Sequence, residues 1–244
     1  MVEAFENVLL VAFLHVPPPG ALKLWSAAFD EEPTGYQTPP PGLSPIHNQA
    51  LVQGNVDGYA VTLGVQSARV DINISAPNPT QPMVPPPSVG DLQTAIDFAI
   101  ARMAKLLPNL KVGRAAMVVQ GHTATESDEK SIEVIRGWLP TLKIPDQSTD
   151  VTYQVTVPRA STVRDGRLIN QLCRWQSVQM QMIQFQIGTA MPSKPVSGAF
   201  VAVVYIDVFG KDLEVMDDEA ALAALKEVSE RAAILASGGI NELS

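Results

Sequence analysis

The chain has 244 residues, and 25 acidic against 17 basic side chains give it a net charge of −8 at pH 7. This balance argues against a general nucleic-acid-binding protein, because that class needs a basic surface. The single cysteine, Cys173, excludes an internal disulfide framework and a cysteine metal cluster. We expect it to be a small buried thiol.

Charged residues make up 17% of the chain, below the roughly 25% of typical globular proteins. The deficit predicts that part of the surface is covered by another molecule, most simply a second copy of the chain. A surface rich in Thr, Gln and Pro is the alternative explanation. The expected partner is therefore the protein itself, as a homo-oligomer, or another protein.

The first predicted element is an apolar run that ends at Val16. Acidic Glu3 and Glu6 precede it, and three prolines follow it instead of a small-residue cleavage pattern, which is unlike a secretory signal. The run is also too short to span a bilayer. We therefore predict a buried strand over residues 7–16 in a soluble, cytoplasmic protein without a membrane partner.

Residues 17–53 form a long excursion with eight prolines and three dispersed aromatic residues. A short helix is predicted over Leu22–Phe29, and the rest reads as irregular chain. Long loops in compact domains are often functional, so one role is to bind a partner. The other is a surface wrap whose aromatic side chains pack against the sheet.

Two alternating stretches then predict a β-hairpin, Tyr59–Val65 and Val70–Ile74, with its turn near Gln66. The Pro-rich linker 76–87 follows, which predicts a loop without regular structure.

Apolar residues at helical spacing predict a largely buried helix over residues 89–107. Its start is expected at a capping box, residues 88–91, and its end at Pro108.

The middle of the chain predicts a strand over residues 112–120 and a helix over residues 125–142, limited by Pro140. A second alternating strand is predicted over residues 150–157. It is expected to stop at Pro158, which cannot donate to a ladder.

A long strand is predicted over residues 175–187. Its apolar residues change parity at Met182-Ile183, which is the signature of a β-bulge.

The clearest strand–helix unit comes last. Residues 199–206 are almost unbroken apolar sequence, typical of a strand covered on both faces. The acidic run Asp217-Asp218-Glu219 then begins a helix, where carboxylates favour the free backbone N–H groups. Apolar residues keep helical spacing to Leu235, and Gly238-Gly239 ends the helix.

The element order β-β-β-α, β-α, β-β-β-α predicts an α+β fold with largely antiparallel sheet and helices on one face. In the first and last groups, the third strand carries an aspartate between aliphatic residues, Asp71 and Asp207. This predicts two units related by internal pseudo-symmetry; a chance recurrence of a common order is the alternative. The corresponding division is residues 1–110, a connecting segment 111–147, and residues 148–244, or one compact domain.

Catalytic motifs are absent from the sequence: it holds no phosphate-binding glycine motif, no nucleophile elbow and no H-E-x-x-H zinc motif. His122, Glu126 and Asp128 are the best local candidates for a metal or acid–base site. The alternative is that these residues form a strand-to-helix loop and cap the next helix, and we prefer it. The sequence predicts no cofactor and no metal.

A basic segment stands out in this acidic chain. Four arginines fall within sixteen residues: Arg159, Arg164, Arg167 and Arg174. Guanidinium groups suit carboxylate or phosphate, so we predict a ligand- or partner-binding loop with a turn at Asp165-Gly166. Solvated loop charge is the alternative.

Asp71 and Asp207, on matching strands, could also be paired carboxylates at a pseudo-twofold interface. The alternative is that each simply meets solvent or a turn.

The leading functional hypothesis is a non-enzymatic binding or assembly protein that acts through an oligomer face, the Pro-rich excursion and the arginine loop. The competing hypothesis is a small-molecule enzyme whose dispersed Asp, Glu, His and Arg residues meet only in the fold. A structural subunit of a larger particle is a third reading.

Overall fold

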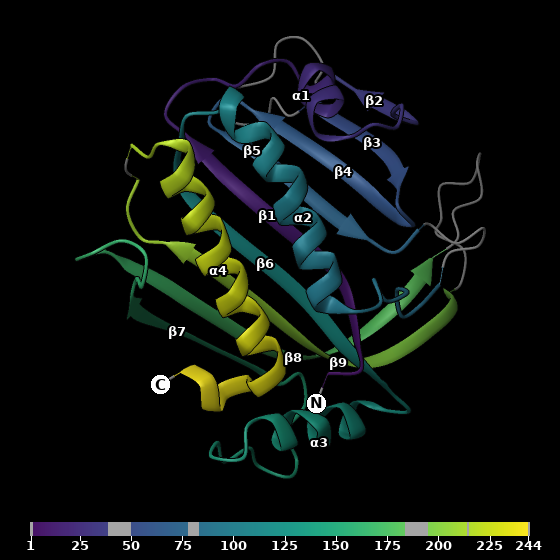
Figure 1. Cartoon of the computed structure of the whole chain (residues 1–244). Helices are drawn as coiled ribbons and strands as arrows, with labels where there is room; N and C mark the ends of the chain where they lie inside the picture. The colour runs from purple at the N-terminus through teal and green to yellow at the C-terminus, as the bar shows by residue number, and fades with distance from the viewer. Residues whose placement is uncertain (1, 39–49, 78–82, 184–194, 214, 244) are drawn as a thin grey trace.

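The computed structural model describes residues 2–38, 50–77, 83–183, 195–213 and 215–243 (Figure 1). These form one nine-stranded sheet with the order β2-β3-β4-β5-β1-β6-β9-β8-β7, in which each paired neighbour is antiparallel. The strands are β1 (Ala4–Leu14), β2 (Gly35–Gln37), β3 (Ala50–Val56), β4 (Tyr59–Gln66), β5 (Arg69–Ser75), β6 (Val112–Thr125), β7 (Thr152–Ala160), β8 (Leu168–Ile183) and β9 (Pro195–Gly210).

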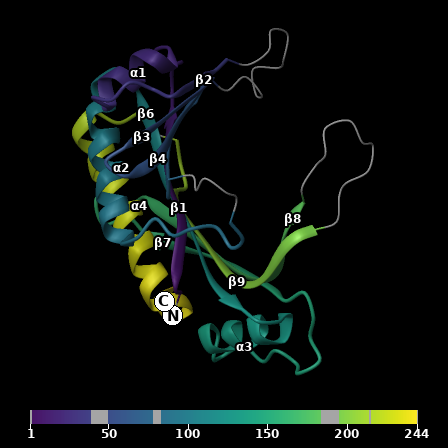
Figure 2. The same cartoon turned by 90° about the vertical axis from the view of Figure 1, so that its right-hand side faces the viewer.

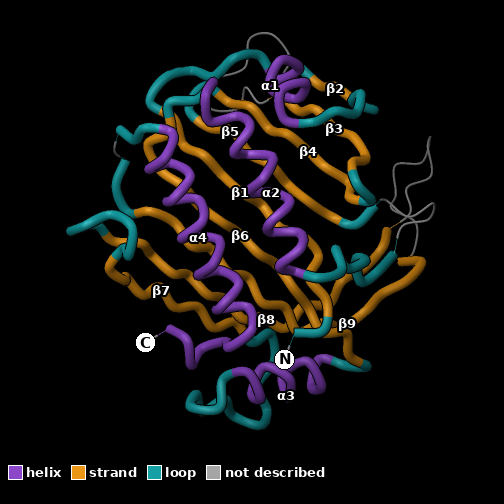
Figure 3. The backbone as a smooth tube through the Cα atoms, in the orientation of Figure 1, coloured by secondary structure: helices purple, strands orange, loops and turns teal. Residues whose placement is uncertain are grey.

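Three helices, α1 (Ala21–Ala28), α2 (Leu92–Leu106) and α4 (Asp218–Gly238), cover one face of the sheet (Figures 1 and 2). Helix α3 (Asp128–Trp138) lies at one end of the sheet and contacts β6, β8 and β9. Figure 3 shows how α2 and α4 run side by side across the central strands. The predicted α+β class, with antiparallel sheet and helices on one face, is therefore confirmed.

Strand alternation builds the core beneath these helices. In β1, Val8, Leu10 and Ala12 are fully buried in the same cluster as Leu225 of α4 and Met103 of α2. Each large apolar side chain buried in this way contributes about 1.5–3 kcal/mol. Cys173 also lies in this core as a free thiol, as expected, and burial raises its pKa to about 12.

Aspartates begin the two long helices. Asp91 Oδ1 accepts from Thr94 N at 2.8 Å, and Asp217 Oδ1 accepts from Ala220 N at 2.8 Å. The expected start of the first long helix was therefore three residues too early, because Ser88 accepts only from Gly90 N, outside the helix. Both carboxylates satisfy a free backbone donor at the positive end of the helix.

The Pro-rich excursion is partly a wrap over the sheet. The short helix predicted there is α1, and its Trp25 is 1% exposed. The indole ring lies where a Cβ atom on Gly54 of β3 would stand, so only glycine allows this close approach. Residues 39–49 of the excursion lie outside the described residues.

A hairpin that begins at the end of this excursion was missed. Strands β3 and β4 pair so that Val56 lies opposite Tyr59, which leaves a two-residue loop. Its residues, Asp57 and Gly58, have φ of 49° and 84°. This is the geometry that Asp-Gly favours in a tight hairpin. The hairpin between β4 and β5 is as predicted.

Other strands run further than predicted. β6 continues through His122 to Thr125, and β7 continues through Pro158 to Ala160 at the outer edge of the sheet. The predicted bulge is confirmed, because the register between β8 and β9 shifts between Met182 and Ile183. Residues 184–187 of that predicted strand lie outside the described residues.

The sheet order bears on the predicted duplication. If β2 is left out, the order is symmetric about the central pair β1 and β6. On one side β1 is followed by β5, β4 and β3, and on the other side β6 is followed by β9, β8 and β7. Leu10 pairs with Met117 across this centre, and Ile72 and Val208 are their outer neighbours, so Asp71 and Asp207 occupy matching positions. Pseudo-symmetry stays a prediction. If it holds, β6 belongs to the second unit, as the counterpart of β1.

Candidate functional site

The face of the sheet opposite α1, α2 and α4 is called the uncovered face below (Figure 2). The alternate residues of β1, Leu9, Val11 and Phe13, project from it. In the same view the hairpin of β8 and β9 curves away from the helices, so this face is concave on that side. Strands from both ends of the chain therefore contribute side chains to one continuous surface.

An Arg–Asp cluster, made of Arg69, Asp71, Arg114 and Asp207, occupies the middle of the uncovered face. Arg69 Nε donates to Asp71 Oδ1 at 2.5 Å. The Arg114 guanidinium carbon lies 3.9 Å from the centre of the Phe13 ring, and that of Arg69 lies 5.7 Å from it. Phe13 is thus a stacking platform for two cations, which limits their contact with water.

Burial raises the pKa of the acidic groups on this face. It raises the pKa of Asp71 despite the hydrogen bond from Arg69, and it raises the pKa of Asp207 despite the charges of Arg114 and Arg69. Burial and the nearby Asp207 carboxylate also raise the pKa of Tyr205. Since Arg69 acts on all three groups, the cluster behaves as one electrostatic unit across the central strands.

Arg174 extends this cluster onto β8. It pairs in register with Tyr205 of β9, and its guanidinium carbon lies 4.9 Å from the centre of the tyrosine ring. This arginine is the one member of the predicted basic loop that reaches the uncovered face.

The other three predicted arginines lie elsewhere. Arg159, in β7, pairs with the core residue Ile169 and so projects toward the helix side, where it shares a cavity with Arg231 of α4. Arg164 and Arg167 lie in the turn between β7 and β8, where Arg167 N donates to Arg164 O at 3.1 Å. The turn at Asp165-Gly166 is as predicted, with Gly166 at φ 66°. The fold does not bring the four arginines together.

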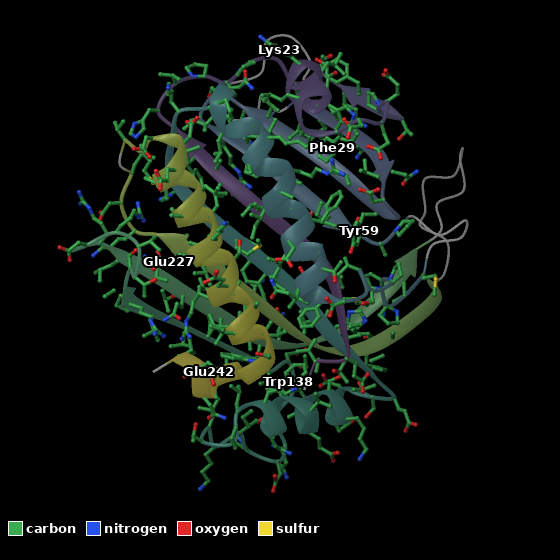
Figure 4. The ribbon with its side chains drawn as sticks, viewed as in Figure 1. Lys23, Phe29, Tyr59, Trp138, Glu227 and Glu242 are labelled. Carbon is green, nitrogen blue, oxygen red and sulfur yellow. The ribbon has the colours of Figure 1, made fainter. Side chains whose placement is uncertain are left out.

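The turn that holds Arg164 and Arg167 is fixed to α4 by one buried carboxylate, Glu227 (Figure 4). Glu227 accepts from Ser161 Oγ at 2.7 Å, from Thr162 Oγ1 at 2.9 Å and from the backbone N–H of Thr162. Nothing in the sequence pattern identifies this contact, because β7 and α4 are far apart in the chain.

His122 has a partner that the sequence did not suggest. Its Nδ1 lies 2.8 Å from Glu6 Oε1, and Gln120 Nε2 donates to Glu6 Oε2 at 3.0 Å. His122 is 3% exposed and Glu6 is 8% exposed. The expected companions of His122 instead belong to the start of α3, where Ser127 is the cap and Asp128 stands in the first turn.

The described part of the chain holds no group of three or more His, Cys, Asp and Glu side chains placed to hold a metal ion. Within the same residues, none of the helices is both long and apolar enough to cross a membrane.

Asp71, Asp207 and Arg174 were identifiable from the sequence, whereas Arg69, Arg114, Phe13 and Tyr205 were not singled out. One signal was readable: Arg69, Asp71 and Asn73 alternate with Val70, Ile72 and Ile74, so polar residues occupy one face of that strand. Arg114 and Phe13 join them only through the pairing of β1 with β5 and β6.

Comparison with known proteins adds no family assignment. No protein-family model matches the chain, and no curated protein sequence matches it. The candidate site therefore rests on the geometry of the uncovered face alone.

Proposed function

We propose that the protein is a non-enzymatic binding and assembly protein whose uncovered face pairs with that of a second copy. One observation carries the proposal: helices cover a single face of the sheet, yet β1, beside the Arg–Asp cluster, also directs apolar side chains to the opposite face. An antiparallel sheet that faces water normally alternates apolar and polar side chains. In β1 the outward positions are instead Leu9, Val11 and Phe13.

Neighbouring strands continue this apolar surface. Ala116 and Val118 of β6 and Val203 of β9 share the face but are at most 9% exposed within one copy, so the half-buried Leu9 and Phe13 offer most of the apolar contact area. Five central strands about 4.8 Å apart, each giving about seven residues of about 3.3 Å, span an area on the order of 500 Å² before side-chain relief is counted. A standard interface buries about 800 Å² on each partner, so the proposed contact must extend beyond these five strands.

Charge favours a second copy as the occupant. The chain carries a net charge of −8, so two copies repel each other over most of their surfaces. The uncovered face differs, because three arginines, Arg69, Arg114 and Arg174, lie there with two aspartates, Asp71 and Asp207. A twofold contact lets arginines of one copy face aspartates of the other, which is the self-complementarity that a symmetric dimer needs.

The test is the mass of the native protein in solution, measured by sedimentation over a range of concentrations. We expect a dimer for the wild type and a folded monomer for Leu9→Glu, because this half-buried residue lies at the centre of the proposed interface. Leu22→Glu is the matched control, since Leu22 is 44% exposed on α1, away from that face. A monomeric wild type, or a dimer that survives Leu9→Glu, overturns the proposal.

The competing function, a small-molecule enzyme, has one observation in its favour: Glu6 and His122 form a carboxylate–imidazole pair such as general bases use. Both side chains are almost completely buried, so substrate cannot reach the imidazole. The pair fits a structural role between β1 and β6, and we prefer assembly.

A further inference from the structure

A hollow of about 310 Å³ lies over one end of the neighbouring strands β3, β4 and β5 (Figure 1). Its size is at the lower limit of the clefts that hold small ligands, about 300 Å³. Among the described residues, no charged side chain lines it. The polar side chains that do so are neutral amides and hydroxyl groups: Thr34, Gln53, Asn55, Thr62 and Ser75.

Strand pairing places this hollow on the uncovered face, away from the Arg–Asp cluster. Asn55 pairs with Ala60, and Ala60 pairs with Ser75. Ser75 also pairs with Asn7 of β1, which projects from the same face as Leu9 because it lies two residues before it. Ser75 ends β5, whereas the cluster occupies the beginning of that strand. The two features therefore share a face but not a position.

A small residue at the centre of this row makes the hollow. Ala60 lies between Asn55 and Ser75, and the longer side chains of Gln53 and Thr62 form the next row. Strands lie about 4.8 Å apart, so Asn55 and Ser75 are separated by about 10 Å across Ala60. A single sugar ring with its hydroxyl groups fits between them.

The floor and one wall of the hollow are held in place by other contacts. Trp25 packs against Gly54 of β3 on the covered face, and its Nε1 donates to Glu31 O at 2.7 Å. Thr34 N donates to Gln53 O at 2.7 Å, which fixes the wall beside β3. A site whose backbone is fixed in advance loses less conformational entropy when a ligand binds.

The polar side chains of the hollow have hydrogen-bonding capacity to spare. Within the part of the chain that the structure describes, those of Gln53, Asn55 and Thr62 make no hydrogen bond. The hydroxyl groups of Thr34 and Ser75 donate to backbone oxygens at 3.3 and 3.4 Å, so each keeps an oxygen that accepts. The amides of Gln53 and Asn55 both donate and accept. Only a ligand that does both replaces water here without losing hydrogen bonds.

We propose that this hollow binds a neutral sugar unit. Each sugar hydroxyl group donates and accepts, as the lining requires, and the methyl group of Ala60 with the ring of Pro77 meets the C–H surface of the ring. An anion finds no cation in this lining and is repelled by the net charge of −8. A cation finds no carboxylate there. The site lies within one copy of the chain, so it does not rest on the proposed dimer.

The test is an NMR titration of the full chain at pH 7 with glucose, galactose and N-acetylglucosamine in turn, and with acetamide as a neutral amide. The side-chain NH₂ signals of Gln53 and Asn55 report directly on the hollow. We expect both signals to shift saturably with at least one sugar. Lack of saturable shifts with every sugar overturns the proposal, and saturation by acetamide alone also overturns it, because the ligand would then be an amide.

Two variants locate the binding. Ala60→Val fills the hollow but keeps every hydrogen-bonding side chain, so saturation should be lost. Thr62→Val removes one hydroxyl group at nearly constant shape and should weaken affinity about fivefold.

A matched pair of amides separates the site from unspecific binding. Gln53→Ala removes an exposed amide that lines the hollow, and Gln154→Ala removes an exposed amide on β7, on the same face but outside the hollow. Only Gln53→Ala should weaken binding, and equal losses in both variants would overturn the proposal.

Melting curves keep folding apart from binding. Valine suits a strand, so Ala60→Val should melt within a few degrees of the wild type. If it does not, Thr62→Val supplies the same test without added volume: a folded Thr62→Val variant with unchanged affinity would contradict a sugar at this position.

Discussion

The covered and uncovered faces of the sheet are formed by the same strands, but helices pack against only the covered face. In β1, Val8 and Leu10 point toward α2 and α4 and are fully buried, whereas Leu9 and Phe13 point the other way and are half-buried. Both faces carry apolar side chains, but the Arg–Asp cluster lies on the uncovered face. The contrast teaches that helices exclude water from one face, whereas charged groups of both signs stand among the apolar side chains of the other.

The largest expected effect is on the covered face. Leu225→Asp places an unpaired carboxylate where α4 meets the sheet, and it also removes a fully buried side chain. Together these cost more than about 5 kcal/mol, which is comparable to the whole stability of many domains. We expect loss of soluble folded protein, measured as yield and by thermal melting. A variant that melts cooperatively near the wild type would mean that α4 is not core.

An intermediate effect is expected at the Arg–Asp cluster. Arg69→Ala leaves the Asp71 carboxylate, 8% exposed, without its donor, and should cost about 1–3 kcal/mol in free energy of unfolding. The double variant with Asp71→Ala should recover part of this loss, because no orphaned charge remains.

The matched control for that pair is Lys130–Glu133, joined at 2.8 Å but more than half exposed on both sides. Lys130→Ala should cost less than about 1 kcal/mol. Chemical denaturation measures the loss in free energy of unfolding for Arg69→Ala and for Lys130→Ala. Equal losses would show that the uncovered face is as accessible to water as an ordinary protein surface.

The smallest expected effect is a pH dependence from Asp207. Burial raises its pKa above the ordinary value of 3.8, so the folded state binds the proton more tightly than the unfolded state. The free energy of unfolding from this group therefore falls as pH rises from about 3.8 through the folded pKa.

Asp207→Asn should remove that fall and slightly raise stability at pH 7. Denaturation curves between pH 4 and pH 7 measure it, with Asp165→Asn in the exposed turn as the control for charge loss alone. A slope unchanged by Asp207→Asn would contradict a buried carboxylate there.

Local hydrophobic patterns in the sequence were enough to predict most helices and strands of the fold. An apolar run located β1, alternation located β4 and β5, and the parity change at Met182-Ile183 located the bulge between β8 and β9. The hairpin at Asp57-Gly58 was missed although its turn signal is strong, because residues 50–53 were assigned to the Pro-rich excursion and residues 54–58 to no element. The strand order could not be predicted, since pairing of β1 with β6 depends on contacts more than a hundred residues apart.

The candidate site was predictable to a lesser degree for the same reason. Asp71 and Asp207 were selected as a pair from their matching strand positions, and Arg174 as one of four arginines close together in the sequence. Their surroundings depend on strand pairing: Arg114 reaches Phe13 only because β6 lies beside β1. His122 contacts Glu6, which is 116 residues away in the sequence. Local periodicity predicts which face a side chain takes, but not which neighbours share that face.

The outermost strands limit what the sheet can join. β2 has three residues, and β7, at the other edge, contains Pro158 and exposes its alternate side chains. A short strand and a proline both discourage another chain from adding a further strand. Fibre-like growth through the edges is therefore disfavoured. If two uncovered faces stack as proposed, the assembly stops at a closed pair.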